Sequence, residues 1–309
     1  MKTLNLKTIV VITVCVLVVF TSCDKNRVNA AKKILNLTAL NSDNSTIVSL
    51  KFDKDVQKDK QTFSIGCYDI SSCTFNKKTN TFGYEDCNNV YKFIDVETFT
   101  KVNQFQLPNS DIVNFVVDTI RNLLIGTYFV DDEDPESKDG TDWIVAMDLN
   151  SGEIVSNKQF YKNGAWGSTY FFRAVENEYV SLNYTNQLLF VNPTTGNINR
   201  TLSLNMSLDN GVYDSKNNRL IGVSYSDETH KNYIVSLDIN TGNVLNKNVA
   251  QSLNFMLSDV SDYDEELNSY IIVNDQQKVL FFDVETGQII QEHQLDFDIS
   301  SIHLWRSSQ

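Results

Sequence analysis

The chain has 309 residues, of which 41% are hydrophobic, and its formal net charge at pH 7 is −13. This length and composition are sufficient for one large folded domain. The excess of acidic residues argues against DNA or RNA as a partner, because nucleic-acid binding needs a basic face.

The first 23 residues are typical of an export signal. An apolar run over residues 8–20 is too short to span a membrane comfortably, and polar sequence follows it. Ser22 precedes Cys23 as in a bacterial lipobox, which would make Cys23 the lipidated N-terminus; the alternative is ordinary signal-peptidase cleavage after Cys23. Residues 24–32 are a short linker. Both routes predict an extracytoplasmic protein, either secreted or held at the membrane only by that lipid.

A repeated turn motif dominates the remaining sequence, residues 33–309. A hydrophobic strand ends in Asp or Asn, and the chain then reverses through a Thr-Gly or Ser-Gly step. The Asp or Asn side chain can accept hydrogen bonds from backbone N–H groups two residues on, and Gly supplies the positive φ of a tight hairpin. Phe99 replaces this Gly in the first copy. The anchor residues, 53, 44, 46 and 45 residues apart, are Asp95, Asp148, Asn192, Asp238 and Asp283.

A spacing of about 45 residues is typical of one blade of a β-propeller. Upstream of each anchor lies a second pair of strands joined by a polar turn, so each unit has four antiparallel strands, A to D. Five units are complete between residues 65 and 295. The N-terminal stretch 33–52 supplies strands B, C and D of a sixth, with Lys51 at the anchor position. Residues 299–305 supply its strand A, which predicts an all-β, six-bladed propeller closed by both chain ends; seven blades is the alternative.

Three cysteines follow the export signal. In a propeller the D-to-A and B-to-C loops share one face, so Cys67 and Cys87 can approach each other. An oxidising compartment favours one disulfide, although three cysteines, with Cys73, leave the pairing open.

An acidic insertion, Asp131–Asp142, lies between strands B and C of the blade anchored at Asp148. Its carboxylates could gather a Ca²⁺ ion, which prefers oxygen ligands, although a solvated acidic loop is the simpler interpretation. The next D-to-A loop contains Trp166 between glycines. We expect Trp166 either to contact a protein or glycan partner or to fold back over the channel. The residues considered as metal ligands are Asp132, Asp134, Asp139 and Asp142, and those considered for partner binding are the same four with Asp131 and Trp166.

The strand-Asp-x-x-Thr-Gly-x-hydrophobic pattern resembles the repeats of the PQQ-like and YVTN-like propeller superfamily. In quinoprotein dehydrogenases a Trp after the Thr-Gly step docks neighbouring blades, and the stretches GEIVSNK, GNVLNKN and GQIIQEH have none. Six-bladed sialidases, another propeller class, use three converging arginines, but Arg121 and Arg219 fall at A–B turns, away from the expected channel mouth. Six-bladed lactonases similar to the SMP-30 group hold a divalent metal in the channel; Asp259 and Asn114 near strand A could serve in that role, but nothing in their spacing distinguishes them.

No nucleophile elbow, phosphate-binding loop or dinucleotide fingerprint occurs in the sequence. We therefore expect a non-catalytic binding or scaffold propeller that contacts a protein or glycan through its loop face, with no cofactor other than the Ca²⁺ considered above. A metal-dependent hydrolase or lactonase with its site in the channel is the alternative, and a structural cell-surface protein is a second one.

Overall fold

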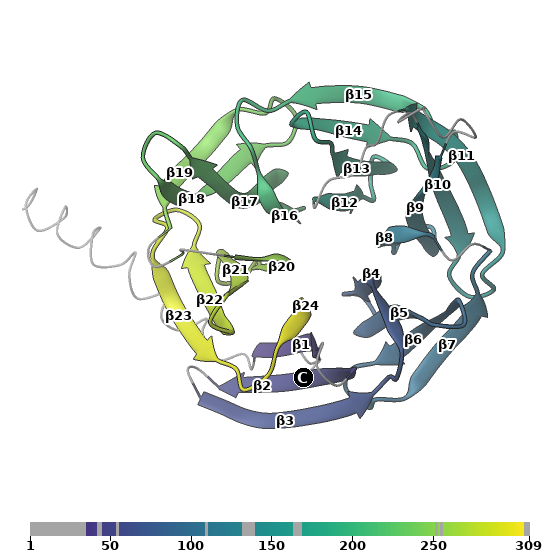
Figure 1. Ribbon diagram of the computed structural model, residues 1–309, viewed down its shortest axis with the longest axis horizontal. Coiled ribbons are helices and arrows are strands. Elements are labelled where there is room, and N and C mark those ends of the chain that lie inside the picture. Colours follow the sequence, from purple (N-terminus) through teal and green to yellow (C-terminus); the bar gives the residue numbers. More distant parts are fainter. Residues whose placement is uncertain are drawn as a thin grey trace, which may run out of the picture.

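The computed structural model describes residues 35–41, 45–53, 56–108, 111–131, 140–162, 169–250, 253 and 256–305. These residues form six four-stranded antiparallel sheets arranged as a ring around a central axis (Figure 1). The predicted six-bladed propeller is confirmed, and the seven-bladed alternative is wrong. The predicted export signal and linker, residues 1–32, lie outside the described residues.

The blades are numbered in chain order from the one that contains β1. In every blade strand A is innermost and strand D is outermost. The strands of blades 1 to 3 are β24 (Ile299–Trp305), β1 (Leu35–Asn41), β2 (Thr46–Asp53) and β3 (Val56–Ser64); β4 (Tyr68–Asn76), β5 (Thr81–Asp86), β6 (Val90–Asp95) and β7 (Lys101–Gln106); and β8 (Val113–Asp118), β9 (Leu123–Asp131), β10 (Gly140–Asp148) and β11 (Ile154–Lys162).

Blades 4 to 6 follow the same plan. Their strands are β12 (Tyr170–Arg173), β13 (Glu178–Leu182), β14 (Gln187–Val191) and β15 (Ile198–Ser203); β16 (Asp209–Asp214), β17 (Arg219–Ser226), β18 (Lys231–Asp238) and β19 (Val244–Val249); and β20 (Met256–Asp264), β21 (Ser269–Asn274), β22 (Lys278–Asp283) and β23 (Ile289–Gln294).

The two ends of the chain meet in blade 1. The C-terminal strand β24 pairs antiparallel with the N-terminal strand β1, with Asn36 opposite Trp305 and Ala39 opposite Ile302. This is the predicted closure. It pairs the inner edge of β1, which would otherwise be a free strand edge open to pairing with another chain.

The C–D turns have the predicted chemistry. The Oδ1 atom of Asp238 accepts hydrogen bonds from the N–H groups of Asn240 and Thr241, both at 2.9 Å, and Gly242 has φ +72°. Phe99 at the equivalent position also has a positive φ, 54°, and its ring stacks on Phe63 at a centroid distance of 6.0 Å. Aromatic packing therefore accompanies a backbone conformation that Gly adopts at lower cost.

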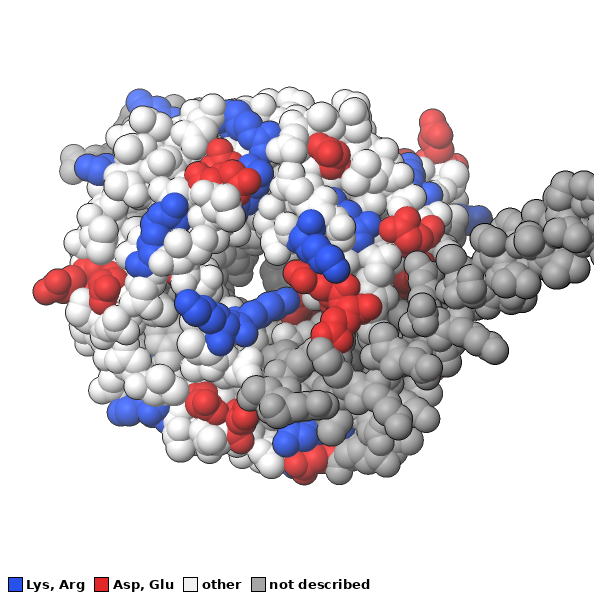
Figure 2. Space-filling view, turned by 180° about the vertical axis from the view of Figure 1, so that it is seen from behind, with Lys and Arg blue, Asp and Glu red and all other residues white. Residues whose placement is uncertain are grey.

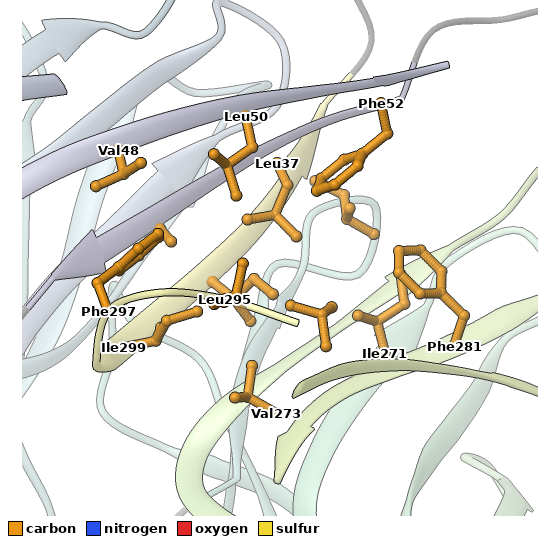
Figure 3. Packing of buried hydrophobic residues seen from close by; sticks show 14 residues of the cluster. Leu37, Val48, Leu50, Phe52, Ile271, Val273, Phe281, Leu295, Phe297 and Ile299 are labelled. Carbon is orange, nitrogen blue, oxygen red and sulfur yellow. The ribbon is translucent and has the colours of Figure 1, made fainter. Parts of the chain in front are cut away.

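The core consists of apolar layers between neighbouring blades. Figure 3 shows the layer between blades 6 and 1, where Leu37, Val48 and Leu50 face Ile271 and Val273. Each is at most 1% exposed. Full burial of such a side chain contributes about 1.5–3 kcal/mol, so these layers hold the ring together.

Polar side chains of the outer strands also join the blades. Asn103 on β7 donates its side-chain amide to the carbonyl oxygens of Leu149 (2.8 Å) and Asn150 (3.0 Å) in blade 3. Asn248 on β19 does the same to Val284 (3.4 Å) and Glu285 (2.8 Å) in blade 6. These contacts link adjacent blades at their C–D turns. The stretches after the Thr-Gly steps contain no Trp that could dock the blades, so the asparagine side chains make this connection.

Candidate binding surface

The two faces of the ring differ in the connections they carry. We call the face with the D–A and B–C connections the loop face, and the face with the A–B and C–D turns the turn face. The acidic insertion and Trp166 were assigned to the loop face from the sequence.

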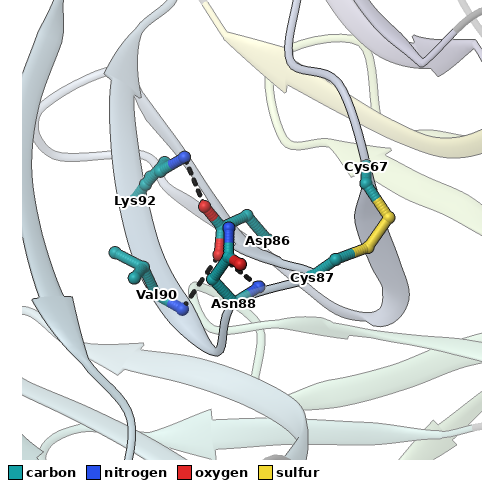
Figure 4. The surroundings of a disulfide bond; sticks show 6 residues. All are labelled: Cys67, Asp86, Cys87, Asn88, Val90 and Lys92. Atoms are coloured by element: carbon teal, nitrogen blue, oxygen red, sulfur yellow. Dashed lines mark hydrogen bonds and ion pairs between the residues drawn. A yellow bond between two sulfur atoms is a disulfide. The ribbon is translucent and has the colours of Figure 1, made fainter.

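A disulfide lies on the loop face. Cys67, between β3 and β4, is bonded to Cys87, between β5 and β6, and both are exposed (Figure 4). The predicted pairing is confirmed, and Cys73 is buried and takes no part in the disulfide. The bond ties the D–A connection entering blade 2 to the B–C turn of that blade.

The turn beside the disulfide is fixed by Asp86. Its Oδ1 atom accepts hydrogen bonds from the N–H groups of Asn88 (2.9 Å) and Val90 (3.1 Å), and Lys92 pairs with its Oδ2 atom (Figure 4). Burial alone would raise the pKa of Asp86, but the bond from Lys92 and the two N–H groups outweigh it, so the pKa lies below its ordinary value. The carboxylate is therefore committed to holding the turn.

Three strands of blade 3 are long. Each of β9, β10 and β11 has nine residues. Gly140 pairs with Asp131, and Thr141 pairs with Lys162. The acidic insertion and the loop that contains Trp166 therefore begin at adjacent strand ends, as the sequence predicted for their common face.

The predicted site residues have different positions relative to this edge. Asp131 is exposed at the end of β9, whereas Asp142 is 3% exposed within β10, opposite Phe129 and Tyr161. The other candidates lie outside the described residues; they are Asp132, Asp134, Asp139 and Trp166. The Ca²⁺ site and the partner-binding role of these residues stay predictions.

Aromatic residues that the sequence analysis did not select lie near this edge. Tyr128 and Trp143 are cross-strand neighbours with centroids 6.1 Å apart and nearly parallel rings, and the Tyr128 hydroxyl donates to Asn157 at 2.9 Å. In the next blades Tyr184 is 78% exposed at the β13–β14 turn and Tyr225 is 47% exposed near the end of β17. The alternation of residues along β9 and β10 could have predicted that Tyr128 and Trp143 share one face of the sheet. The exposure of Tyr184 and Tyr225, in contrast, depends on the packing of neighbouring blades.

The three histidines lie in separate surroundings. His230 is in the β17–β18 turn, 3.2 Å from the Tyr225 hydroxyl, and His293 stacks on Phe52 at a centroid distance of 4.0 Å. His303 stacks on Phe75 in β4 at 5.3 Å. Among the residues that the structure describes, no group of three or more His, Cys, Asp or Glu side chains is arranged to hold a metal ion.

The arginines that the sequence analysis compared with a sialidase site make contacts between and within blades. Arg121 bonds Asp118 and the carbonyl oxygen of Ala174. Arg219 pairs with Asp214 at 2.8 Å and with Glu285 at 3.1 Å. Burial lowers the pKa of Arg219, but its partners more than compensate, so the pKa is raised and the guanidinium stays charged. These side chains stabilise the turn face.

Candidate channel ligands can also be placed. Asn114 lies on β8 with φ 57°, and its side-chain amide donates to the Thr127 hydroxyl at 3.5 Å. Its carbonyl oxygen accepts a bond from the Tyr179 hydroxyl at 3.2 Å. Asn114 is therefore part of an interblade polar contact, and the side chain of Asp259 lies outside the described residues. Within the described part of the chain no helix is long and apolar enough to cross a bilayer.

No known protein family and no curated protein sequence matches this chain. Three of the solved structures with a similar fold are BamB from Moraxella catarrhalis (12% identity, TM-score 0.42), dihydro-heme d1 dehydrogenase NirN in complex with DHE (10%, 0.46) and KlHsv2 with loop 6CD replaced by a Gly-Ser linker (10%, 0.48). The matches cover 83%, 84% and 84% of this chain and 69%, 63% and 81% of the others. The PQQ-like membership stays a prediction.

Proposed function

We propose that the protein is an extracytoplasmic, non-catalytic binding or scaffold propeller that contacts a protein or glycan through its loop face. The contact centres on the insertion Asp131–Asp142 and on Trp166, and the exposed rings of Tyr184 and Tyr225 extend it over blades 4 and 5. Aromatic side chains are the commonest anchors of such contacts because they bury a large area at a low cost in conformational entropy.

One observation carries this proposal. The pairing of Thr141 with Lys162 brings together the starts of the two loops that the sequence singled out. Tyr184, at 78% exposure, belongs to the B–C turn of the adjacent blade on the same face. An acidic loop, an aromatic loop and an exposed tyrosine thus share one sector of one face.

The proposed compartment rests on the export signal and on the disulfide, because disulfides persist in oxidising environments. We propose that Cys23 is the lipidated N-terminus. Mass spectrometry of the mature protein should find a diacylglycerol thioether on Cys23. An unmodified N-terminus after residue 23 would instead identify a secreted protein.

The binding role is tested by capture from cell-envelope extracts. The wild-type protein should retain a partner that mass spectrometry identifies, and Trp166→Ala and Tyr184→Ala should each weaken its retention at least fivefold. Val175→Ala is the matched control, because Val175 is 82% exposed but lies in the A–B turn of the same blade, on the turn face. Equal retention by all three variants would overturn the proposal.

The alternative of a metal-dependent hydrolase is tested separately. A protein that holds Ca²⁺ in its folded state gains thermal stability when the ion is added. We expect no rise in Tm with Ca²⁺ up to millimolar concentration. A saturable rise that Asp259→Asn abolishes would favour the channel metal site of this alternative, whereas one that Asp132→Asn abolishes would indicate the Ca²⁺ site in the acidic insertion.

A further inference from the structure

Blade 1 differs from the others in the connection between its two inner strands. In blades 2 to 6 a covalent turn joins strand A to strand B, as between Asp118 and Leu123 or Asp214 and Arg219. In blade 1 strand A is the C-terminal strand β24, and strand B is the N-terminal strand β1. At the position of the missing turn the ladder ends with Trp305 opposite Asn36.

A carboxylate from the neighbouring blade reaches this position. Asp262 on β20 is 7% exposed, and its Oδ2 atom accepts a hydrogen bond of 2.7 Å from the backbone N–H of Leu304. β24 is the inner edge strand of its sheet, so an N–H group on its channel side has no further strand to pair with. Asp262 provides the acceptor.

A lysine from the other neighbouring blade completes the contact. The Nζ atom of Lys77, in the turn between β4 and β5, lies 2.9 Å from the Oδ1 atom of Asp262. The same Oδ1 atom accepts a bond of 2.7 Å from the Tyr263 N–H. One carboxylate thus connects blades 6, 1 and 2. Figure 2 shows basic and acidic side chains meeting beside the central hollow.

The acid is specific to this junction. Equivalent positions on the inner strands of blades 2 to 5, two residues before the A–B turn, carry no charge: Val116 opposite Ile125, Phe171 opposite Val180 and Val212 opposite Ile221 are apolar, and Thr74 opposite Gly83 is an uncharged polar residue. Asp262 lies opposite Ile271 in the same register. A buried carboxylate at a place where these blades carry no charge is costly unless it is hydrogen-bonded and paired, and both conditions are met here.

We propose that Asp262 and Lys77 form a latch that holds the C-terminal strand β24 in the ring, and that release of this latch opens the propeller at blade 1 while the other blades stay folded. Charge-assisted hydrogen bonds of this length are stronger than neutral ones. They substitute for the covalent turn that blade 1 lacks. Detachment of β24 would leave the inner edge of β1 unpaired and available to another strand.

Hydrogen–deuterium exchange on the whole protein tests the latch, because local opening is measured by the exchange of the amides it exposes. Lys77→Met removes the charge but keeps an apolar stem, and Asp262→Asn removes the charge but keeps one oxygen acceptor. Both should accelerate exchange of the amides in β24, including Leu304, at least tenfold. Amides in β8, β12 and β16 should exchange as in the wild type.

The matched control is Lys60→Met. It breaks the ion pair of Lys60 with Asp296, which is as short, at 2.7 Å, but has partners 32% and 79% exposed. Exposed pairs contribute little, so β24 should exchange at the wild-type rate in this variant.

Two results would overturn the latch: unchanged exchange in β24 for Lys77→Met, or equal acceleration in all six blades, which would indicate a general loss of stability. Should Asp262→Asn fail to fold, Lys77→Met decides alone, because the Lys77 side chain is 58% exposed and can be shortened without a cavity.

Discussion

The guanidinium carbon of Arg200 lies 3.5 Å from the centre of the Phe190 ring, within blade 4. Its terminal nitrogens donate to the carbonyl oxygens of Asn240 (3.2 Å) and Ile239 (3.1 Å) in the C–D turn of blade 5. One side chain therefore combines a cation–π contact in its own blade with two bonds to the next. Asn103 and Asn248 make the corresponding bonds from blades 2 and 5.

We expect Arg200→Met to destabilise the protein by about 1–3 kcal/mol, because it removes the cation–π contact and both hydrogen bonds while keeping the apolar stem. Urea unfolding monitored by tryptophan fluorescence gives the free energy of unfolding. The control Lys101→Met, on an exposed outer-strand residue, should change it by less than about 0.5 kcal/mol. Equal effects of the two variants would show that blade docking does not depend on Arg200.

Substitution of two glycines, Gly66 and Gly287, distinguishes the stability cost of backbone strain from that of steric crowding. Gly66 and Gly287 have φ values of +72° and +67°, but a Cβ atom on Gly66 would meet nothing within 4 Å, whereas one on Gly287 would lie 2.7 Å from the Cβ of Asn248. Gly66→Ala should cost about 1–2 kcal/mol from the left-handed conformation alone. Gly287→Ala should cost at least about 1 kcal/mol more, since it also crowds the neighbouring blade. Equal melting temperatures of the two variants would contradict this account.

The disulfide should contribute to stability mainly through the unfolded chain. Cys67 and Cys87 are 20 residues apart, and a loop of about this length corresponds to about 3 kcal/mol in the chain-entropy description. The variant with both cysteines changed to Ser should lose about 2–4 kcal/mol in the free energy of unfolding. Addition of dithiothreitol should lower the Tm of the wild type but not that of this variant; a decrease in both would show that reduction acts elsewhere.

The stability of the protein should decrease in mild acid because of His303. Burial lowers the pKa of His303 from 6.5 to about 4; the nearby Asp262 raises it and Lys77 lowers it. Between about pH 6.5 and pH 4 the unfolded chain binds a proton at this residue and the folded protein does not, so the free energy of unfolding falls as the pH falls. At about 1.4 kcal/mol per pH unit, the loss amounts to about 3 kcal/mol at pH 4.

Unfolding measured across this pH range tests the prediction. His303→Phe keeps an aromatic ring against Phe75 and should flatten the pH dependence in that window. His230→Asn, at an exposed turn position with φ 53°, should leave it as in the wild type. A His303→Phe variant with the wild-type slope would assign the pH dependence to other groups.

Part of the structure could be predicted residue by residue. The Asp238 turn, the pairing of β24 with β1 and the Cys67–Cys87 bond all occur as the sequence indicated. Each follows from short-range chemistry or from a repeat that fixes which loops share a face. For the candidate site the sequence predicted a face and a sector of that face, and the binding role of its residues stays a prediction.

Burial of polar side chains could not be predicted in this way. Asn36 and Asn183 each begin an Asn-x-Thr sequence, which on its own indicates an exposed glycosylation site. In the fold they are 0% and 4% exposed, and Asn183 accepts bonds from the Thr185 and Gln187 N–H groups of its own turn. Whether a polar residue in a strand is buried depends on the neighbouring blade that packs against it. The local sequence does not indicate that contact.

The sequence by itself determined the repeating unit, because a turn and the alternation of a strand depend on residues within a few positions of one another. The number of blades and the way the ring closes followed from the number of repeats and from the incomplete units at the two ends of the chain. Only the tertiary structure decided that Arg200 docks one blade on the next and that Asp262 meets Leu304 and Lys77. Those contacts join residues 39 to 185 positions apart, and they exist because closure of the ring brings remote strands to within hydrogen-bond distance.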